Sequence, residues 1–348
     1  MKSHTIAVTM GDAAGIGPEI IAKAFREEPE VLRACFVAGD VQAMRRAAQQ
    51  VAAGQVQLPV LQISFPEEGQ LAPPQCIPVL QIGDALAPVA MGQVQACAGE
   101  FAGRCVTWAA DAVLKGEIAA LVTAPIHKEA LSAAGKPYDN YPGHTELLQA
   151  RAATARGVPI AEMPVRMMLA NEALRTVLVS IHVSLRDALD AVTFDNVLET
   201  IRITRIALRN VLGREPRIAV AGLNPHAGEG GLFGREEIET ISPAIAAARV
   251  EGADVHGPIA PDTVFMRARH ADDHPGEFDV VVAMYHDQGL IPVKYMGVEQ
   301  GVNVTLGLPL VRTSPDHGTA FDIAGRGLAS AESLIEAVRM AKRLANLT

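Results

Sequence analysis

The sequence predicts a two-domain α/β protein in which helices cover both faces of a largely parallel sheet. Its 348 residues exceed one average domain of roughly 150 residues. Short apolar runs alternate with Ala-rich stretches of helical length, the pattern of parallel strands joined by crossover helices. Aromatic residues make up only 4% of the chain, so we expect a core of Ala, Val, Leu and Ile, which favours buried aliphatic strands.

The first strand is expected at residues 6–10, where an apolar run stops at Gly11 and Asp12. Pro18 suits the first turn of a helix that continues to about Arg26, because proline lacks the N–H that this turn leaves unused. The later apolar runs, expected to be strands, are 35–38, 119–123, 175–181, 217–221 and 279–284.

Further helices are expected at 93–115, 194–212 and 236–250, and from about 329 to the end. Ser330 suits the N-cap of the last helix, because a serine hydroxyl accepts a hydrogen bond from a free backbone N–H there. The segment from Glu67 to Pro88 is rich in Pro and Gly, so we expect an irregular surface connection.

Charge and cysteine usage narrow the partners and the compartment. The formal net charge of -9 argues against nucleic acid and anionic membranes as partners. The four cysteines form no CxxC pair and are expected to be reduced thiols, as in the cytoplasm. The first apolar run is too short for a signal peptide, and no run approaches the roughly 18 apolar residues that cross a bilayer. We therefore expect a cytoplasmic protein.

Three histidines, His182, His226 and His286, each stand just past an apolar run. Open parallel sheets place binding groups at the carboxyl ends of their strands, so these imidazoles are expected to meet in one cleft. Three neutral imidazoles suit zinc or another divalent ion and leave a position open for substrate oxygens. Because they form no HxxxH or HExxH pair, the alternative is that each is an ordinary structural or surface histidine.

A bound cation stabilises the negative charge that develops on an alcohol oxygen when a hydride leaves, and it later polarises the ketone during decarboxylation. Asp287 and Asp262 are candidates either for taking the alcohol proton or for holding the metal ligands in place.

No GxGxxG fingerprint follows a strand, so a nicotinamide cofactor is expected to bind in some other way. The candidate cofactor loop is residues 316–327. The segment DHGTAFDIAGRG resembles the HGSAPDIAGKG loop that carries the adenosine end of the cofactor in the isocitrate and isopropylmalate dehydrogenase superfamily. The alternative is a Gly-rich turn before a helix. The candidate cofactor-binding residues are His317, Gly318, Thr319, Asp322 and Gly325.

A pocket for a phosphate group requires fixed hydrogen-bond donors. His144 and Thr145 follow Gly143 at the start of a helix, where backbone N–H groups attract anions. Lys294, Asn303 and Arg312 are polar residues in apolar surroundings, and an arginine holds phosphate or carboxylate oxygens bidentately. The alternative for Lys294 and Arg312 is that their charged side chains are ordinary solvated surface groups.

Together these motifs resemble the 4-hydroxythreonine-4-phosphate dehydrogenase family of vitamin B6 (pyridoxine) biosynthesis. The matching segments are TMGDAAGIGPEI from Thr9, VTAPIHKEAL from Val122, YPGHTELL from Tyr141, GLNPHAGEGGLFG from Gly222, GPIAPDTVF from Gly257, AMYHDQGLIPVKY from Ala283 and GVNVTLGLPLVRTSPDHGTAFDIAGRG from Gly301. They are ordered and spread over almost the whole chain.

The resemblance implies an α/β/α two-domain fold of the isocitrate/isopropylmalate dehydrogenase type, with residues 1–128 and 313–348 in one domain and 129–312 in the other. It implies a homodimer with active sites shared between the subunits. In that site His182, His226 and His286 are the metal ligands. The substrate-binding residues are then His144, Thr145, Lys294, Asn303 and Arg312.

The implied reaction is the NAD-dependent oxidation of the 3-hydroxyl of 4-phosphooxy-L-threonine, followed by decarboxylation to 3-amino-2-oxopropyl phosphate. NADP is the alternative cofactor, and zinc, magnesium and cobalt are the candidate metals. The small phosphorylated hydroxy acid is the expected partner, with no nucleic acid and no membrane.

Other readings stay open. The tyrosine in YPGHTELL is closer to relatives that act on 4-phospho-D-threonate or 4-phospho-D-erythronate, and IHVSL around His182 departs from the THLPL of the B6 enzymes. A third possible activity is that of a branch that oxidises unphosphorylated, carboxylated cyclohexadiene diols. That branch needs no phosphate-binding residues, whereas this chain keeps GHTE, Asn303 and Arg312. A non-catalytic alternative is a metabolite-binding homologue. A metal-dependent hydrolase that uses the same histidines is an alternative of another enzyme class.

Overall fold

The computed structural model describes residues 4–271, 274–297 and 300–347 and divides the chain into two compact units. The first contains Met1–Pro164 with Leu308–Thr348, and the second contains Val165–Gly307. The sequence placed the divisions at 128/129 and 312/313. The first unit extends beyond residue 128 because the helices that follow, α4 (Lys128–Ala133) and α5 (His144–Arg156), pack against α3 (Ala96–Leu114).

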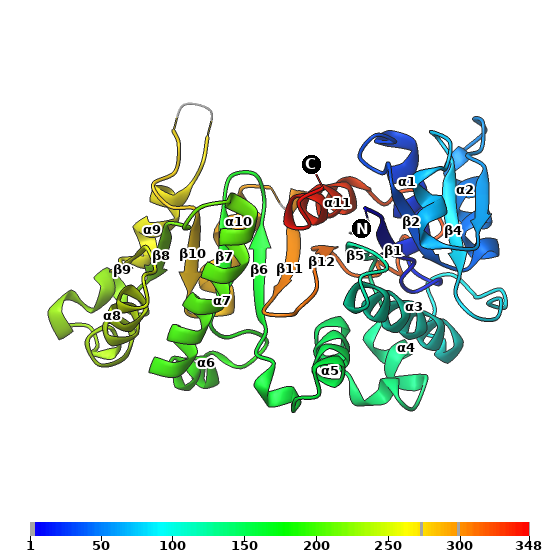
Figure 1. Ribbon diagram of the computed structural model, residues 1–348. Helices are drawn as coiled ribbons and strands as arrows, with labels where there is room; N and C mark the ends of the chain where they lie inside the picture. Colours follow the sequence, from blue (N-terminus) through cyan, green and yellow to red (C-terminus); the bar gives the residue numbers. More distant parts are fainter. Residues whose placement is uncertain (1–3, 272–273, 298–299, 348) are drawn as a thin grey trace. The chain divides into compact units, whose positions relative to one another are not determined.

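The first unit contains a parallel sheet in the order β3-β4-β2-β1-β5-β12 (Figure 1). Its strands are β1 (Ile6–Thr9), β2 (Cys35–Gly39), β3 (Val60–Ile63), β4 (Ile77–Gln81), β5 (Ala120–Thr123) and β12 (Arg312–Pro315). Because β1, β5 and β12 are neighbours and run the same way, the loops that follow them leave the same edge of the sheet.

The other helices of this unit are α1 (Gly17–Glu27), α2 (Val41–Ala52) and α11 (Glu332–Leu344), with short 3-10 turns η1 (Pro66–Gln70), η2 (Tyr138–Asn140) and η3 (Ile160–Glu162). Figure 1 shows α3 and α11 on opposite sides of the strands, as a sheet covered on both faces requires. The Asp40 side chain caps α2 by accepting a hydrogen bond from Ala43 N at 2.7 Å.

The second unit contains a mixed sheet in the order β11-β6-β7-β10-β8-β9. Its strands are β6 (Arg166–Ala170), β7 (Arg175–Leu178), β8 (Ile218–Ala221), β9 (Val255–Ile259), β10 (Val280–Ala283) and β11 (Val302–Leu306). Strand β6 runs antiparallel to both of its neighbours here, whereas β7, β10, β8 and β9 are parallel. A buried aliphatic cluster, which includes Leu178, Val281 and Leu290, forms its core.

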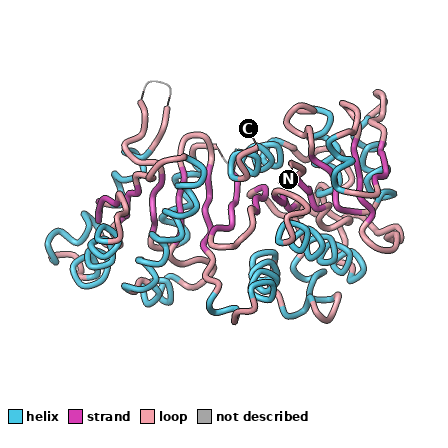
Figure 2. Tube along the Cα trace, in the orientation of Figure 1, coloured by secondary structure: helices cyan, strands magenta, loops and turns pink. Residues whose placement is uncertain are grey.

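The helices of the second unit are α6 (Leu185–Ala191), α7 (Phe194–Leu212), α8 (Ser242–Val250), α9 (Pro261–Ala268) and α10 (His286–Tyr295). A 3-10 segment η4 (Pro225–Gly231) and a π-helical turn η5 (Glu237–Ile241) complete it. Figure 2 shows helices and strands alternating along the trace, so the predicted α/β class is confirmed. No helix of the described residues is long and apolar enough to cross a membrane.

Two local expectations were wrong. The segment 67–88 contains a buried strand, β4, which lies between β2 and β3; Pro78 within it hid the strand pattern, because prolines are rare inside sheets. The terminal helix begins at Glu332 with Ala331 at the N-cap position. Ser330 lies one residue earlier, and its hydroxyl accepts a hydrogen bond from Glu332 N at 3.2 Å.

Candidate functional site

A buried arginine and a half-buried histidine lie together in the first unit. Arg312 opens β12, is 4% exposed, and donates from Nε and Nη2 to Thr123 Oγ1 at 3.0 and 2.7 Å. Burial lowers the pKa of the Arg312 guanidinium to about 10, and the Glu146 carboxylate opposes that effect. The side chain therefore remains cationic at neutral pH inside the protein.

His144 is the first residue of α5, directly after Gly143. Burial and the charge of Arg312 lower the pKa of the His144 imidazole well below its usual value, so the ring is neutral at neutral pH. Its Nε2 atom is inaccessible to solvent and has no hydrogen-bond partner among the described residues. A neutral imidazole beside a buried guanidinium is suited to an anionic oxygen.

The other predicted substrate-binding residues are divided between the units. Thr145 is half-buried on the first turn of α5 in the first unit. Lys294 lies in the last turn of α10 and Asn303 is half-buried on β11, both in the second unit.

The three predicted metal ligands all belong to the second unit and follow the neighbouring parallel strands β7, β10 and β8. The rings of His182 and His286 have centroids 5.7 Å apart with their planes at 45°. The Nδ1 atom of His286 is 2.7 Å from Asp287 Oδ1, which leaves Nε2 of that ring to face a ligand. A carboxylate on the far nitrogen is the usual support of a metal-binding histidine.

The loop that carries His226 has an unusual backbone. Residues 226–230 all have φ between 42° and 78°, the left-handed region that non-glycine residues rarely adopt. Beneath this loop the buried carboxylate of Glu237 accepts hydrogen bonds from Leu223 N and Asn224 N at 2.7 and 2.8 Å, and from Asn224 Nδ2 at 3.0 Å. These bonds fix the chain just before His226.

Gln288 connects the His226 loop to the turn that carries His286. Its Nε2 donates to Gly222 O at 2.8 Å, and its Oε1 accepts from Met284 N at 2.7 Å. Neither Glu237 nor Gln288 was predicted from the sequence. Their contacts join segments that are distant in the chain, and neither residue has a characteristic spacing from the histidines.

Within one chain, no group of three or more His, Cys, Asp or Glu side chains among the described residues lies close enough to hold a metal. The structure thus brings His182 and His286 together but does not complete a set of three with His226. Imidazole donors, one of them supported by a carboxylate, fit the chemistry of a divalent ion. Because the resemblance implies sites shared between subunits, the three-histidine site stays a prediction.

The two acid–base candidates occupy different positions. Asp287 contacts His286 and its side chain is 72% exposed. Asp262 is exposed in the first turn of α9, a helix that packs against β8 and the His226 loop.

The predicted cofactor loop follows β12 in the first unit and is held by α1. Lys23 Nζ donates to Gly327 O at 2.8 Å and to Ala329 O at 2.5 Å, while the buried Glu19 accepts from Ala329 N at 3.1 Å. Ile16 N donates to Thr319 O at 3.0 Å. These contacts attach the loop and the residues just after it to α1 and to Ile16 before it; Lys23 and Glu19 were not predicted from the sequence.

Within that loop, the candidate residues differ in exposure: Thr319 is buried, His317 is half-buried, and Gly318 and Asp322 are exposed. The Nε2 atom of His317 is inaccessible and has no hydrogen-bond partner within the described ranges. Gly325 has φ +80° and lies against Met91, where a side chain would be strained.

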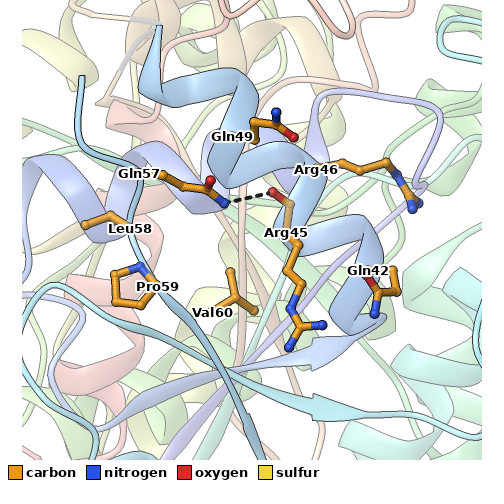
Figure 3. A pocket seen from close by; sticks show the side chains of 8 residues that line it. All are labelled: Gln42, Arg45, Arg46, Gln49, Gln57, Leu58, Pro59 and Val60. Atoms are coloured by element: carbon orange, nitrogen blue, oxygen red, sulfur yellow. Dashed lines mark hydrogen bonds between the residues drawn. The ribbon is translucent and has the colours of Figure 1, made fainter. Parts of the chain in front are cut away.

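A separate pocket of about 470 Å³ lies between α2 and the amino end of β3 (Figure 3). Its lining includes Arg45 and Arg46, and Gln57 Nε2 donates to Arg45 O at 3.3 Å. The carboxyl ends of the strands, where the predicted residues cluster, are at the other edge of this sheet. This pocket is therefore not part of the candidate site.

Comparison with known proteins adds independent information. A family model described as "Pyridoxal phosphate biosynthetic protein PdxA" matches residues 31–341. A 4-hydroxythreonine-4-phosphate dehydrogenase from Beijerinckia indica is 51% identical over 99% of this chain and 96% of its own length. A D-threonate 4-phosphate dehydrogenase from Pectobacterium atrosepticum is 45% identical over 99% of this chain and 100% of its own length.

Among solved structures, a crystal structure of 4-hydroxythreonine-4-phosphate dehydrogenase from Klebsiella pneumoniae superposes with a TM-score of 0.84 at 43% identity. It covers 98% of this chain and 99% of that one. The fold therefore matches over nearly the whole length.

Proposed function

The chain belongs to the PdxA family of pyridoxal phosphate biosynthetic proteins, and from this premise we propose that it is an NAD-dependent, metal-assisted dehydrogenase of a small phosphorylated hydroxy acid. The proposed reaction oxidises the 3-hydroxyl of 4-phosphooxy-L-threonine and then releases carbon dioxide, giving 3-amino-2-oxopropyl phosphate. The proposed form is a cytoplasmic homodimer, and NADP remains the alternative cofactor.

The observation that carries this proposal is the pair formed by the buried Arg312 and the half-buried His144. A guanidinium that is still cationic although buried, next to a neutral imidazole at a helix N-terminus, is suited to the phosphate or carboxylate of the substrate. Thr145, Lys294 and Asn303 would supply further donors to the same substrate.

We propose that separate groups of residues bind the metal and the cofactor. His182, His226 and His286 would hold a divalent ion such as zinc, magnesium or cobalt, which would stabilise negative charge on the substrate oxygen. Asp287 holds the His286 ring in one orientation. His317, Gly318, Thr319, Asp322 and Gly325 would bind the adenosine end of NAD, the acceptor of the substrate hydride.

The proton of the substrate alcohol requires a base, and we propose Asp287 or Asp262 for this step. Asp287 is exposed beside His286, so it can exchange protons with solvent. Asp262 lies on a helix that packs against the His226 loop.

A second candidate activity is the dehydrogenation of 4-phospho-D-threonate or 4-phospho-D-erythronate, which carry a hydroxyl in place of the amine. The full-length similarity to the D-threonate 4-phosphate dehydrogenase supports it, together with Tyr141 in the YPGHTELL segment.

The deciding experiment compares kcat/KM for 4-phosphooxy-L-threonine, 4-phospho-D-threonate and 4-phospho-D-erythronate, with NAD and a divalent ion present. The main proposal predicts the highest value for the amine-bearing acid. A higher value for either hydroxyl acid would select the second candidate. Binding without turnover of all three would indicate a metabolite-binding homologue instead.

A further inference from the structure

A buried carboxylate at the end of β1 has an oxygen that nothing in the described structure uses. Asp12 is 0% exposed, and its Oδ1 accepts a hydrogen bond from Ala14 N at 2.8 Å. Its Oδ2 is inaccessible to solvent and has no hydrogen-bond partner among the described residues. Burial raises the pKa of Asp12, and the Ala14 N–H and the nearby His127 offset only part of this rise. A carboxylate in this environment requires a donor.

His127 adds a second polar atom without a partner. Its Nδ1 is also inaccessible and has no hydrogen-bond partner in the described part of the chain. The His127 ring stacks on Phe321, with centroids 4.5 Å apart and planes at 19°. Phe321 belongs to the predicted cofactor loop, so this stacking attaches the histidine to the loop.

The backbone holds these groups in place. Asp12 N donates to Pro125 O at 2.9 Å, which joins the loops after β1 and β5. Gly11 has φ +73°, and a Cβ there would lie 2.4 Å from Pro125 O, so this close approach requires glycine. These contacts fix the backbone of the two loops that carry the unpartnered atoms.

We infer that Asp12 and His127 form a subsite for the carboxamide of the nicotinamide cofactor, whose N–H group donates to Asp12 Oδ2. The inference rests on the proposed function. An anionic group would be repelled by Asp12 and an apolar group would leave it unsatisfied, so the ligand must supply N–H or O–H donors. Hydroxyl groups and the substrate ammonium are the other sources of such donors, but the stacking of His127 on Phe321 of the cofactor loop favours the carboxamide of the cofactor.

Titration calorimetry tests this with NAD and with 3-acetylpyridine adenine dinucleotide, in which a methyl ketone replaces the carboxamide and removes its N–H donors. Asp12→Asn keeps an oxygen for Ala14 N but cannot accept at the other position. We expect it to weaken NAD binding about ten- to a hundredfold, the loss of a hydrogen bond to a charged group, and to leave the binding of the analogue nearly unchanged.

The matched control is Asp111→Asn, which removes a carboxylate of the same unit that pairs with Arg151. It is expected to leave both dissociation constants unchanged. His127→Phe keeps a ring for stacking on Phe321 and removes the nitrogen atoms. It provides a second test if Asp12→Asn does not fold, and it is also expected to weaken NAD more than the analogue.

Equal effects of these variants on NAD and the analogue, or no effect on either, would overturn the inference while the proposed function stands. Weaker binding of 4-phosphooxy-L-threonine but not of 4-phospho-D-threonate, with NAD unaffected, would assign the subsite to the substrate ammonium and also overturn it. Failure of the unmodified protein to bind either NAD or NADP would instead contradict the proposed function.

Discussion

Arg312 shows how a single buried charge identifies a binding group. The side chain is held by Thr123, and its charge adds to the effect of burial in lowering the pKa of the neighbouring His144. Arg312→Lys keeps the positive charge but loses the planar guanidinium that binds oxygens bidentately. We expect KM for the phosphorylated substrate to rise about tenfold or more, measured by steady-state kinetics.

The control for this prediction is Arg326→Lys, which changes an exposed arginine of the predicted cofactor loop. Its effect on the KM of the phosphorylated acid is expected to be small. An unchanged KM in Arg312→Lys would remove this residue from the substrate-binding set.

The sequence was informative for residues whose surroundings are local. Arg312 and Asn303 were recognised as polar residues in apolar runs, and His182 and His286 as residues just past strands. Asp12 and Glu237 were not singled out, because their significance depends on buried contacts with segments that the sequence does not place beside them.

At the scale of elements, Glu237 shapes the His226 loop. Glu237→Gln replaces one of the oxygens that accept hydrogen bonds from Leu223, Asn224 and the Asn224 amide, so the loop loses part of its support. We expect metal affinity to fall about ten- to a hundredfold, as when the supporting partner of a ligand is lost. Competition with a metal-binding dye measures this.

The neighbouring Glu236 provides a matched control, because it is exposed and also accepts from Asn224 Nδ2, at 2.7 Å. Glu236→Gln is expected to change metal affinity little. Equal metal affinities in the two variants would mean that Glu237 only stabilises the fold.

Asp279, just before β10, connects that strand to the segment before β8. It accepts hydrogen bonds from Arg217 N at 2.7 Å and from both terminal nitrogens of Arg214 at 2.8 Å. Burial alone would raise the pKa of Asp279, but these bonds and those from the Arg217 side chain lower it far below its usual value of 3.8. The contribution to stability is therefore present above pH 4 or so and is lost as the pH falls further.

Asp279→Asn is expected to lower the free energy of unfolding by about 1–3 kcal/mol at neutral pH. The difference from the unmodified protein should shrink as the pH drops below about 4, where the unfolded Asp279 becomes protonated. Urea unfolding at several pH values measures it. A difference that stays constant down to pH 3 or so would contradict the ion-pair explanation.

The elements themselves were predicted where the apolar pattern is simple. Strands β1, β2, β5, β7, β8 and β10 and helix α7 occur where the sequence indicated. β4 was missed because Pro78 disguises it, and the predicted helix at 236–250 begins with the π-helical turn that contains Glu237. Such turns depend on tertiary contacts that periodicity does not report.

At the scale of the whole molecule, the family was recognisable from ordered motifs that extend from Thr9 to Gly327. In the described part of the chain His182 and His286 lie together, but no set of three potential metal ligands forms, so the three-histidine site stays a prediction. If the ligands come from two chains, as the family resemblance implies, the spacing within one sequence cannot reveal the site.

Subunit mixing tests the proposed sharing. His226→Ala and His286→Ala are each expected to be inactive. If each metal site takes His226 from one copy and His286 from the other, a mixed dimer of the two variants regains one intact site and activity returns. If all ligands come from one chain, both sites of the mixed dimer stay defective. Light scattering should give twice the chain mass of 36.7 kDa.

The central claim, that this protein oxidises and decarboxylates a phosphorylated hydroxy acid, is tested most directly by product stoichiometry. The protein is mixed with 4-phosphooxy-L-threonine, NAD and a divalent ion, and reduced nicotinamide, carbon dioxide and inorganic phosphate are measured together. We predict equal amounts of reduced nicotinamide and carbon dioxide, without release of inorganic phosphate by the enzyme. Release of phosphate without any reduction of NAD would contradict the account and indicate a hydrolase.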